Sequence, residues 1–277
     1  MRKKCFTVGF TPHHDMKGNV METQILTVTS ILCQRKEKPK LLFTGPILAA
    51  LGFNAKSLVV AKSAGDTITL ESRGTGIEAY KQAVSEVREK GHTTVEVINL
   101  DKSLSIILSG DWLLNSGFKT GDVVIARFET GVITVKRLDL LELGFSINDV
   151  IKTKVHKIQI AVNKKKRVPR VLFSGHWLDD IGFQAGQYAK ITYQNEMITF
   201  ETGREAGDIS DLYNKNHGRP PKVKIHKTPC YNGYAPCFQL KGEWLSAEGF
   251  QIGDTLVVLY EHERIRVKRL DISKYGF

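Results

Sequence analysis

The sequence predicts a mainly β protein of two small β-barrels, each a pseudo-dimer of two units with the order strand, strand, short helix, strand, strand. Three observations support this fold: a fourfold internal repeat, a second repeat of twice that length, and strand-like alternation of apolar and polar residues. One unit of about 50 residues buries too little apolar surface to be stable alone. We therefore expect neighbouring units to interlock their strands around a common core.

The shorter repeat is a Gly-x-Trp-Leu motif, followed by a Gly-Phe pair and then by a second glycine. It is clearest around Trp112, Trp177 and Trp244. The first copy is degraded, because Ile47 replaces the tryptophan and Lys56 replaces the second glycine. The lead glycines of the four copies are Gly45, Gly110, Gly175 and Gly242.

Each motif predicts a short helix. Thr44, Ser109 or Ser174 stands directly before the lead glycine, and we expect its hydroxyl to cap the helix. The tryptophan and leucine are expected to face the core rather than to stack on bases, so Trp177→Ala should leave a cavity. The glycine of the Gly-Phe pair can adopt the left-handed conformation that ends a helix.

Apolar residues at every second position predict strands on either side of the motif. Ile158, Ile160 and Val162 alternate with other residues and predict an opening strand with one buried and one solvated face. Residues 123–128 and 132–135 predict the closing hairpin of the second unit, joined by a tight turn at Gly131.

The longer repeat groups the four units in pairs, because residues 135–145 recur as residues 267–277, two units later. Between the first two units, apolar residues at three- and four-residue spacings (Ile77, Tyr80, Val84, Val87) predict a helix. The corresponding joint, 204–219, is more polar and is expected to be looser. The predicted organisation is a poorly ordered tail over 1–20, a first double unit over 21–145 (22–72 and 92–138, joined by a helix over 77–90), and a second over 146–277 (153–203 and 220–270).

The motif resembles the SymE-type toxins of bacterial toxin–antitoxin systems, which belong to the AbrB/SpoVT-like swapped-hairpin superfamily. Trp-Leu, Gly-Phe and Gly-Asp recur at fixed offsets in units two and four, whereas unit three has Gly186-Gln187. The resemblance covers all four units, although family members carry a single copy. It implies swapped-hairpin barrels and nucleic-acid binding. The SymE branch is regarded as acting on RNA and as a candidate endoribonuclease, and the wider superfamily contains DNA-binding regulators and antitoxins.

Composition independently favours a polyanionic partner. The 277 residues carry 40 Lys and Arg against 29 Asp and Glu, which gives a net charge of +11 and a pI near 9.4. The sequence contains no run of about 20 apolar residues, so it predicts no membrane span. The four cysteines are scattered, which favours a reducing cytoplasm; the resemblance implies that this is the bacterial cytoplasm or nucleoid. They are Cys5, Cys33, Cys230 and Cys237.

Two acid-free basic stretches open units three and four, and the closing strand of unit four adds a third group of cations. If the units interlock, we expect these residues to merge into one surface that neutralises several phosphates. The alternative is a set of solvated strand faces. The predicted nucleic-acid-binding residues are Lys152, Lys154, Lys157, Lys164, Lys165, Lys166, Arg167, Arg170, Lys215, Arg219, Lys222, Lys224, Lys227, Arg264, Arg266 and Lys268.

No residue pattern predicts catalysis. Walker, Rossmann, His-Glu-x-x-His and nucleophile-elbow motifs are absent. His176 could exchange protons with neighbouring aspartates, but an outward-facing polar helix surface is the simpler interpretation. Cys230 and Cys237 with His226 could be imagined as a metal site, yet their spacing fits no standard zinc pattern. We expect neither a metal nor a cofactor, and catalytic residues stay unassigned.

Three functions remain open. The first is a SymE-like protein that acts on RNA by binding or scission. The second is a DNA-binding regulator or nucleoid protein of AbrB type, and the third is a protein-interaction scaffold whose basic runs only keep it in solution. Nucleic acid, RNA before DNA, is the expected partner. Intrachain pseudo-dimers are expected, with further oligomerisation or swapping between chains left open.

Overall fold

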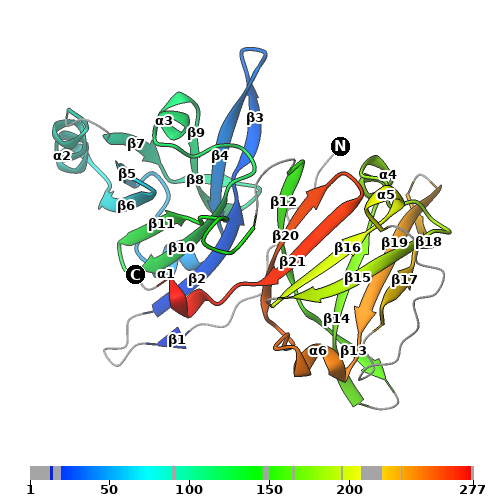
Figure 1. Cartoon of the computed structure of the whole chain (residues 1–277). Helices are drawn as coiled ribbons and strands as arrows, with labels where there is room; N and C mark the ends of the chain where they lie inside the picture. The colour runs from blue at the N-terminus through cyan, green and yellow to red at the C-terminus, as the bar shows by residue number, and fades with distance from the viewer. Residues whose placement is uncertain are drawn as a thin grey trace. The chain divides into compact units, whose positions relative to one another are not determined.

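The computed structural model describes residues 13–14, 20–88, 92–145, 150–163, 166–194, 196–206, 220–231 and 233–275. The chain is mainly β, with antiparallel sheets and short helices (Figure 1). It divides into two compact units, unit 1 up to Asp139 and unit 2 from Leu140 onward. The repeats place this boundary at 145/146. Leu140–Phe145 falls in unit 2, where the Arg266 guanidinium lies over the Phe145 ring at 5.6 Å from its centre.

Unit 1 contains two copies of the predicted order, except that a bend divides the opening strand in two, so three strands precede each helix. The first copy comprises β2 (Val20–Thr27), β3 (Thr29–Cys33), β4 (Lys36–Thr44), α1 (Ile47–Ala50), β5 (Leu58–Ala64) and β6 (Thr67–Gly74). The second comprises β7 (His92–Glu96), β8 (Ile98–Leu100), β9 (Ser103–Ser109), α3 (Asp111–Asn115), β10 (Val123–Glu129) and β11 (Val132–Arg137). Helix α2 (Ile77–Val87) joins them. A short β1 (His13–His14) pairs with β2, and the rest of the predicted tail up to residue 19 lies outside the described residues.

Unit 2 repeats this order. Its first copy comprises β12 (Lys152–Lys157), β13 (Gln159–Asn163), β14 (Lys166–Ser174), α4 (Trp177–Asp180), β15 (Tyr188–Gln194) and β16 (Met197–Glu201). Its second comprises β17 (Lys222–Lys224), β18 (His226–Cys230), β19 (Gly233–Lys241), α6 (Glu243–Ala247), β20 (Thr255–Glu261) and β21 (Arg264–Arg269), followed by a 3₁₀ turn, η1 (Ile272–Lys274). At the polar joint only α5 (Gly203–Ala206) and the residues from 220 onward are described.

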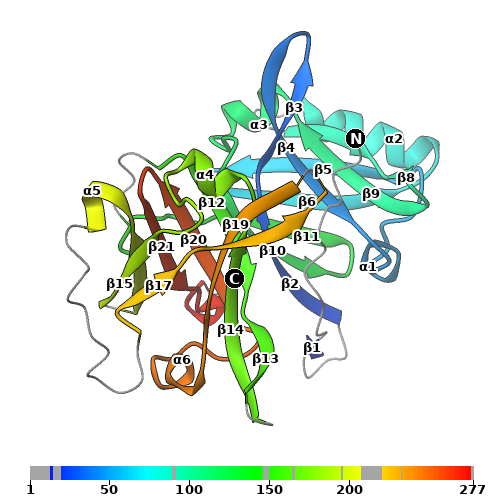
Figure 2. The same cartoon turned by 90° about the vertical axis from the view of Figure 1, so that its right-hand side faces the viewer.

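The two copies in each unit interlock their strands within one chain (Figures 1 and 2). Hairpin β10–β11 lies between β2 and β6, so the closing hairpin of copy two pairs with the opening strand of copy one. Hairpin β5–β6 reciprocates by pairing with β7. The sheet orders are β1-β2-β10-β11-β6-β5-β7 and β3-β4-β9-β8 in unit 1, and β12-β20-β21-β16-β15-β17 and β13-β14-β19-β18 in unit 2.

One buried residue at the bend of each opening strand separates the two sheets of a unit. Val28 stands between β2 and β3, and its backbone exchanges hydrogen bonds with the partner copy: Gly121 N–H donates to the Val28 carbonyl at 2.8 Å, and Val28 N–H donates to the Asp122 carbonyl at 2.8 Å. The same pattern holds at Val97, Ile158 and Ile225. Because the ladders break at these corners, no sheet of the described residues closes into a barrel, and the predicted closed barrels are corrected to two sheets per unit.

Each unit has its own core of aromatic and aliphatic side chains. The leucine and phenylalanine of the repeated motif contribute to it in every copy, as Leu48 with Phe53 and Leu178 with Phe183 illustrate. The glycine of each Gly-Phe pair has the predicted left-handed conformation, with φ between 85° and 90°. The predicted hydroxyl caps are wrong, because the N-caps are Pro46, Gly110, His176 and Gly242, without side-chain capping bonds.

The tryptophans are only partly buried, so their predicted position in the core needs correction. Trp177 packs on the edge of the core, and its indole N–H donates to the Ser174 carbonyl at 3.0 Å. A Cβ at Gly175 would lie 2.6 Å from the indole, and one at Gly242 would lie 2.7 Å from Trp244. Glycine and tryptophan recur together in these copies because the ring folds back over the glycine.

Two predicted apolar faces lie in solvent. Ile160 is 50% exposed and Val162 is 71% exposed, because the opening strand turns at Ile158 and continues into the outer strand β13. On α2, Ala79 and Ala83 are buried, whereas Ile77 is 73% exposed. The spacing therefore identified the helix correctly, although the apolar residues that predict it are not the ones that are buried.

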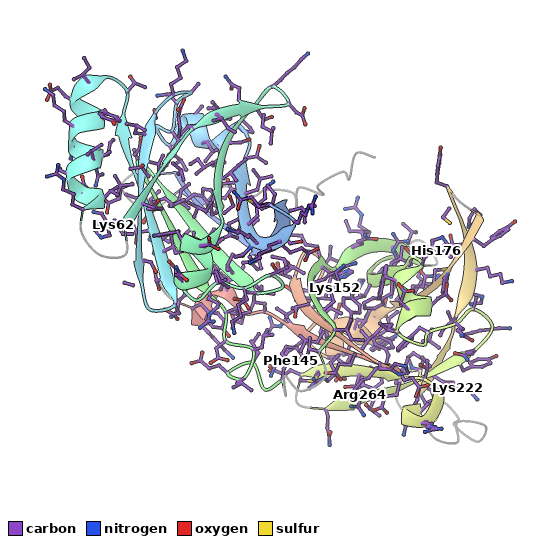
Figure 3. The ribbon with its side chains drawn as sticks, turned by 90° about the horizontal axis from the view of Figure 1, so that it is seen from above. Lys62, Phe145, Lys152, His176, Lys222 and Arg264 are labelled. Carbon is purple, nitrogen blue, oxygen red and sulfur yellow. The ribbon has the colours of Figure 1, made fainter. Side chains whose placement is uncertain are left out.

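Charged side chains fix the α2 orientation. The Arg73 guanidinium donates to both carboxylate oxygens of Glu86, at 2.7 Å from Nε and 2.6 Å from Nη2. Lys62, labelled in Figure 3, lies 3.4 Å from Glu86 and 3.0 Å from Glu71. The hydrogen bonds from Arg73 lower the pKa of Glu86 to about 2. Arg73 and Lys62 thus hold α2 on the sheet through their ion pairs with Glu86.

Candidate nucleic-acid interface

Strand β12 presents three of the predicted cations. Lys152 and Lys157 are exposed, whereas the Lys154 amine is half-buried, 4.7 Å from the centre of the Trp177 ring and 5.6 Å from that of Tyr260. No carboxylate of the described residues forms an ion pair with Lys154, and burial, with Lys152 nearby, lowers the pKa of its amine.

A partly buried polar group, His156, accompanies Lys154. His156 Nε2 lies 2.7 Å from the Tyr260 hydroxyl, and the His156 ring packs 5.5 Å from Phe173. Burial, and to a lesser degree the Lys154 ammonium, lowers the pKa of His156 to about 4. Burial likewise raises the pKa of Tyr260. His156 is therefore neutral at pH 7, and its ring packs against the core residue Phe173.

The second group of predicted cations lies on β14. Lys166 forms an ion pair with Glu243 at 2.9 Å, Arg167 is exposed, and Arg170 donates to Gln159 Oε1 at 2.7 Å. Lys164 and Lys165 lie outside the described residues.

Strands β17 and β18 carry the third group. The amines of Lys222 and Lys224 lie 5.5 Å and 5.9 Å from the centre of the Tyr188 ring, and this ring is 44% exposed. Lys227 is exposed on β18. The two cations predicted upstream, Lys215 and Arg219, lie outside the described residues.

Strand β21 carries the last group, which is largely engaged in ion pairs. Arg264, Arg266 and Lys268 share a face as predicted, but Arg264 lies 3.2 Å from Glu201, and Arg266 pairs with the buried Glu261. The Arg266 side chain is 11% exposed. Its charge is already matched inside the protein, so Arg264 and Arg266 are poor choices for a phosphate surface.

The basic strands do not merge into one surface. β12 and β17 are the two outermost strands of the six-stranded sheet, and β13 and β18 are the outermost strands of the four-stranded sheet. Lys152 and Lys222 are well separated in Figure 3. The two copies of unit 2 interlock as expected, but interlocking places their opening strands at opposite edges of the sheet, so the expected single surface is corrected to two.

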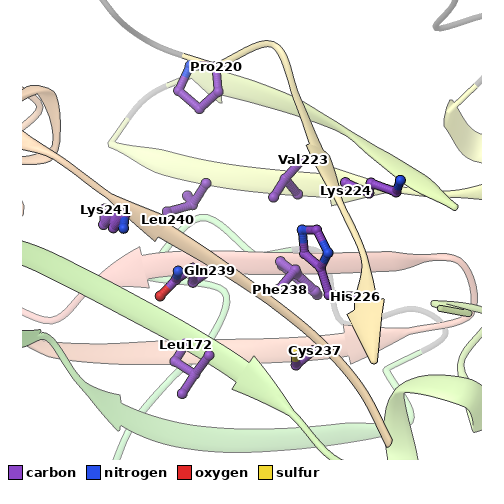
Figure 4. Close-up of a pocket in the computed structure, with 10 residues that line it drawn as sticks. All are labelled: Leu172, Pro220, Val223, Lys224, His226, Cys237, Phe238, Gln239, Leu240 and Lys241. Carbon is purple, nitrogen blue, oxygen red and sulfur yellow. The ribbon is translucent and has the colours of Figure 1, made fainter. Parts of the chain in front are cut away.

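One basic surface borders a groove of about 370 Å³ (Figure 4). β17 and β18 form one wall with Val223, Lys224 and His226, and β14 and β19 form the other with Leu172, Cys237 and Lys241. None of the ten lining residues is acidic. We call this feature the β17–β19 groove.

The sequence prediction missed Lys241. It stands directly before the lead glycine of copy four, where the other copies have Thr44, Ser109 and Ser174. Lys241 also pairs in register with Arg170 on β14, which brings a residue of the first basic stretch beside the groove. A comparison of the copies position by position would have revealed this substitution.

The cysteine and histidine residues of unit 2 do not form a metal cluster. Among the residues with described positions, no three His, Cys, Asp or Glu side chains are arranged to hold a metal ion. Cys237 lies opposite His226 in the β18–β19 ladder, whereas Cys230 Sγ lies 3.3 Å from His176 Nε2. His176 thus contacts a thiol that the sequence had not linked to it.

Comparison of the chain with protein-family models, curated proteins and solved structures finds no match. The resemblance to SymE-type toxins therefore stands on its motif alone. Across the ranges that the structure describes, no helix is both long enough and apolar enough to cross a membrane.

Proposed function

We propose that the protein binds nucleic acid through unit 2, at the β17–β19 groove and the lysines beside it. The observation that carries this proposal is the acid-free lining of the groove, together with Lys224, Lys241 and His226 on its walls. Lys224 and Lys241 form no ion pair with a described carboxylate, so their charges are available to phosphates. The net charge of +11 supports the same partner class.

RNA is the preferred target in this proposal, on the strength of the SymE-like motif. The interlocked hairpins, in which β10–β11 pairs with β2 and β5–β6 with β7, agree with the swapped-hairpin architecture that the resemblance implies. We propose binding without assigning scission, and among the described residues no three His, Cys, Asp or Glu side chains are arranged to hold a metal ion. DNA binding of AbrB type is the alternative target.

The decisive experiment measures affinity for RNA and DNA of equal length over a series of salt concentrations. Removing Lys224 and Lys241 together should weaken binding and lower the slope of log K against log salt by about 1.4, because each phosphate contact in a single strand contributes about 0.7. Preference for RNA at every salt concentration is the expected result.

A matched control removes two exposed lysines from unit 1, Lys36 and Lys102. This variant has the same net charge as K224A/K241A and should bind nearly as well as the parent protein. Equal losses of affinity in both variants would show that only net charge matters for binding. Binding by the parent protein that does not depend on salt would favour the scaffold alternative.

A further inference from the structure

The β17–β19 groove lies where copy four carries a smaller residue than the preceding copy. Cys237 stands five residues before its lead glycine, the position that Arg170 holds in the preceding copy. The Arg170 side chain extends over the sheet to Gln159, at 2.7 Å from its Oε1. The shorter Cys237 side chain, opposite His226, leaves the equivalent space open.

The groove combines an apolar floor with a cationic rim. Leu172 and Val223 line it from opposite walls, and Lys241 and His226 stand at its edges (Figure 4). Its volume of about 370 Å³ lies at the low end of the roughly 300–1,000 Å³ that small-molecule pockets span. Such a space suits one planar ring with an attached phosphate.

We infer that the β17–β19 groove takes one unpaired nucleotide, with its base between Leu172 and Val223 and its phosphate toward Lys241. This inference rests on the proposed function and specifies the substrate class, single-stranded rather than duplex nucleic acid. A base inside a duplex is stacked and paired, so it could enter only after being extruded at a cost of a few kcal/mol. Any base can stack on apolar and aromatic side chains, and the Lys241 ammonium can pair with the backbone phosphate.

Cys237 provides a direct probe, because its thiol lines the groove and is partly exposed. We expect a short single-stranded RNA, at about ten times its Kd, to slow alkylation of Cys237 by N-ethylmaleimide roughly tenfold, as simple occupancy requires. Duplex RNA of the same length should slow it much less. Cys33 in unit 1, which is exposed, serves as the internal control and should react at an unchanged rate in site-resolved mass spectrometry.

A pair of substitutions at one position separates groove filling from charge. C237R places in the groove the residue that the preceding copy has, and it adds a positive charge, whereas C237S leaves the groove open. C237R should lose most of the preference for single strands over duplex while keeping its affinity for duplex, and C237S should keep the preference. Thermal unfolding of both variants checks that each is folded.

The two proposals fail in distinguishable ways. Salt-dependent RNA binding without protection of Cys237, or with an undiminished single-strand preference in C237R, would overturn the nucleotide site and leave the proposed function standing. Tighter protection by duplex than by single strands would overturn it as well. Absence of RNA and DNA binding would remove both proposals.

Discussion

Lys56 in copy one holds the same left-handed backbone conformation as Gly121 in copy two, with φ values of 66° and 97°. Lys56 N–H donates to the Val97 carbonyl at 2.8 Å, just as Gly121 N–H donates to Val28. The degraded copy therefore keeps the corner contact without the residue suited to it. A left-handed conformation costs a non-glycine residue about 1–2 kcal/mol.

We predict that Lys56→Gly raises the free energy of unfolding by roughly 0.5–1 kcal/mol, because relief of this strain exceeds the added entropy of the unfolded chain. Chemical denaturation measures the change. Gly121→Ala is the reverse control and should destabilise by about 1 kcal/mol, since nothing lies within 4 Å of its added Cβ and only the backbone conformation opposes it. Destabilisation by Lys56→Gly would show that the lysine side chain makes a compensating contact.

Acid should destabilise the protein through His156. Its pKa is lowered in the folded state from 6.5 to about 4, so the unfolded state binds more protons between these values, and stability falls as the pH drops through this window. The full effect, reached below pH 4, is up to about 3 kcal/mol. His156→Leu should flatten the dependence of unfolding free energy on pH between 6.5 and 4, because it removes the titrating group. Leucine should fit this position, since Leu26 stands two residues before Val28 as His156 stands two residues before Ile158. An unchanged pH profile in this variant would exclude His156 as the cause.

Glu86 should hold α2 on its sheet. Glu86→Gln removes the charge that Arg73 and Lys62 contact, and we expect a loss of roughly 1 kcal/mol, discounted for solvent screening, with faster hydrogen exchange in α2. Glu86 has a lowered pKa of about 2, so its contribution is present above pH 4.5 and is lost as the pH falls toward 2. Glu78→Gln on the same helix, whose side chain is 85% exposed, should change neither measurement. Equal effects from both substitutions would contradict the assigned role.

The repeated unit and its interlocking could be predicted because they depend on short-range patterns. Leu178 and Phe183 recur at the same offsets in every copy, and an apolar residue at a fixed position of a repeat is usually buried. Period-two alternation failed at Ile160, because a sequence pattern cannot show where a strand leaves the core at a corner such as Ile158. The helix over Ile77–Val87 was predicted correctly, but its spacing does not show which face is buried: the small Ala79 and Ala83 face inward, because they allow a closer approach to the sheet than Ile77 does.

The candidate site was only partly visible in the sequence. Charge runs identified Lys224. The Arg264–Glu201 ion pair joins residues of different copies that become neighbours only when β16 and β21 pair, whereas Glu261 lies five residues before Arg266 in the same hairpin, so local sequence could have indicated that ion pair. The groove depends on Cys237, a residue without charge, and becomes apparent only from pairing in three dimensions. Interlocking also places the two opening strands of unit 2, β12 and β17, at opposite edges of the six-stranded sheet, which composition cannot reveal.

The exchange of hairpins between copies has a consequence for synthesis on the ribosome. Strand β2 ends at Thr27, but its neighbour β10 begins only at Val123. The nascent opening segment must therefore wait, unpaired along that side, until nearly a hundred further residues have been translated, and such distant pairing slows the search for the native state. Until the second copy emerges, the first copy has an unpaired strand edge, the kind of surface that makes folding intermediates prone to aggregation.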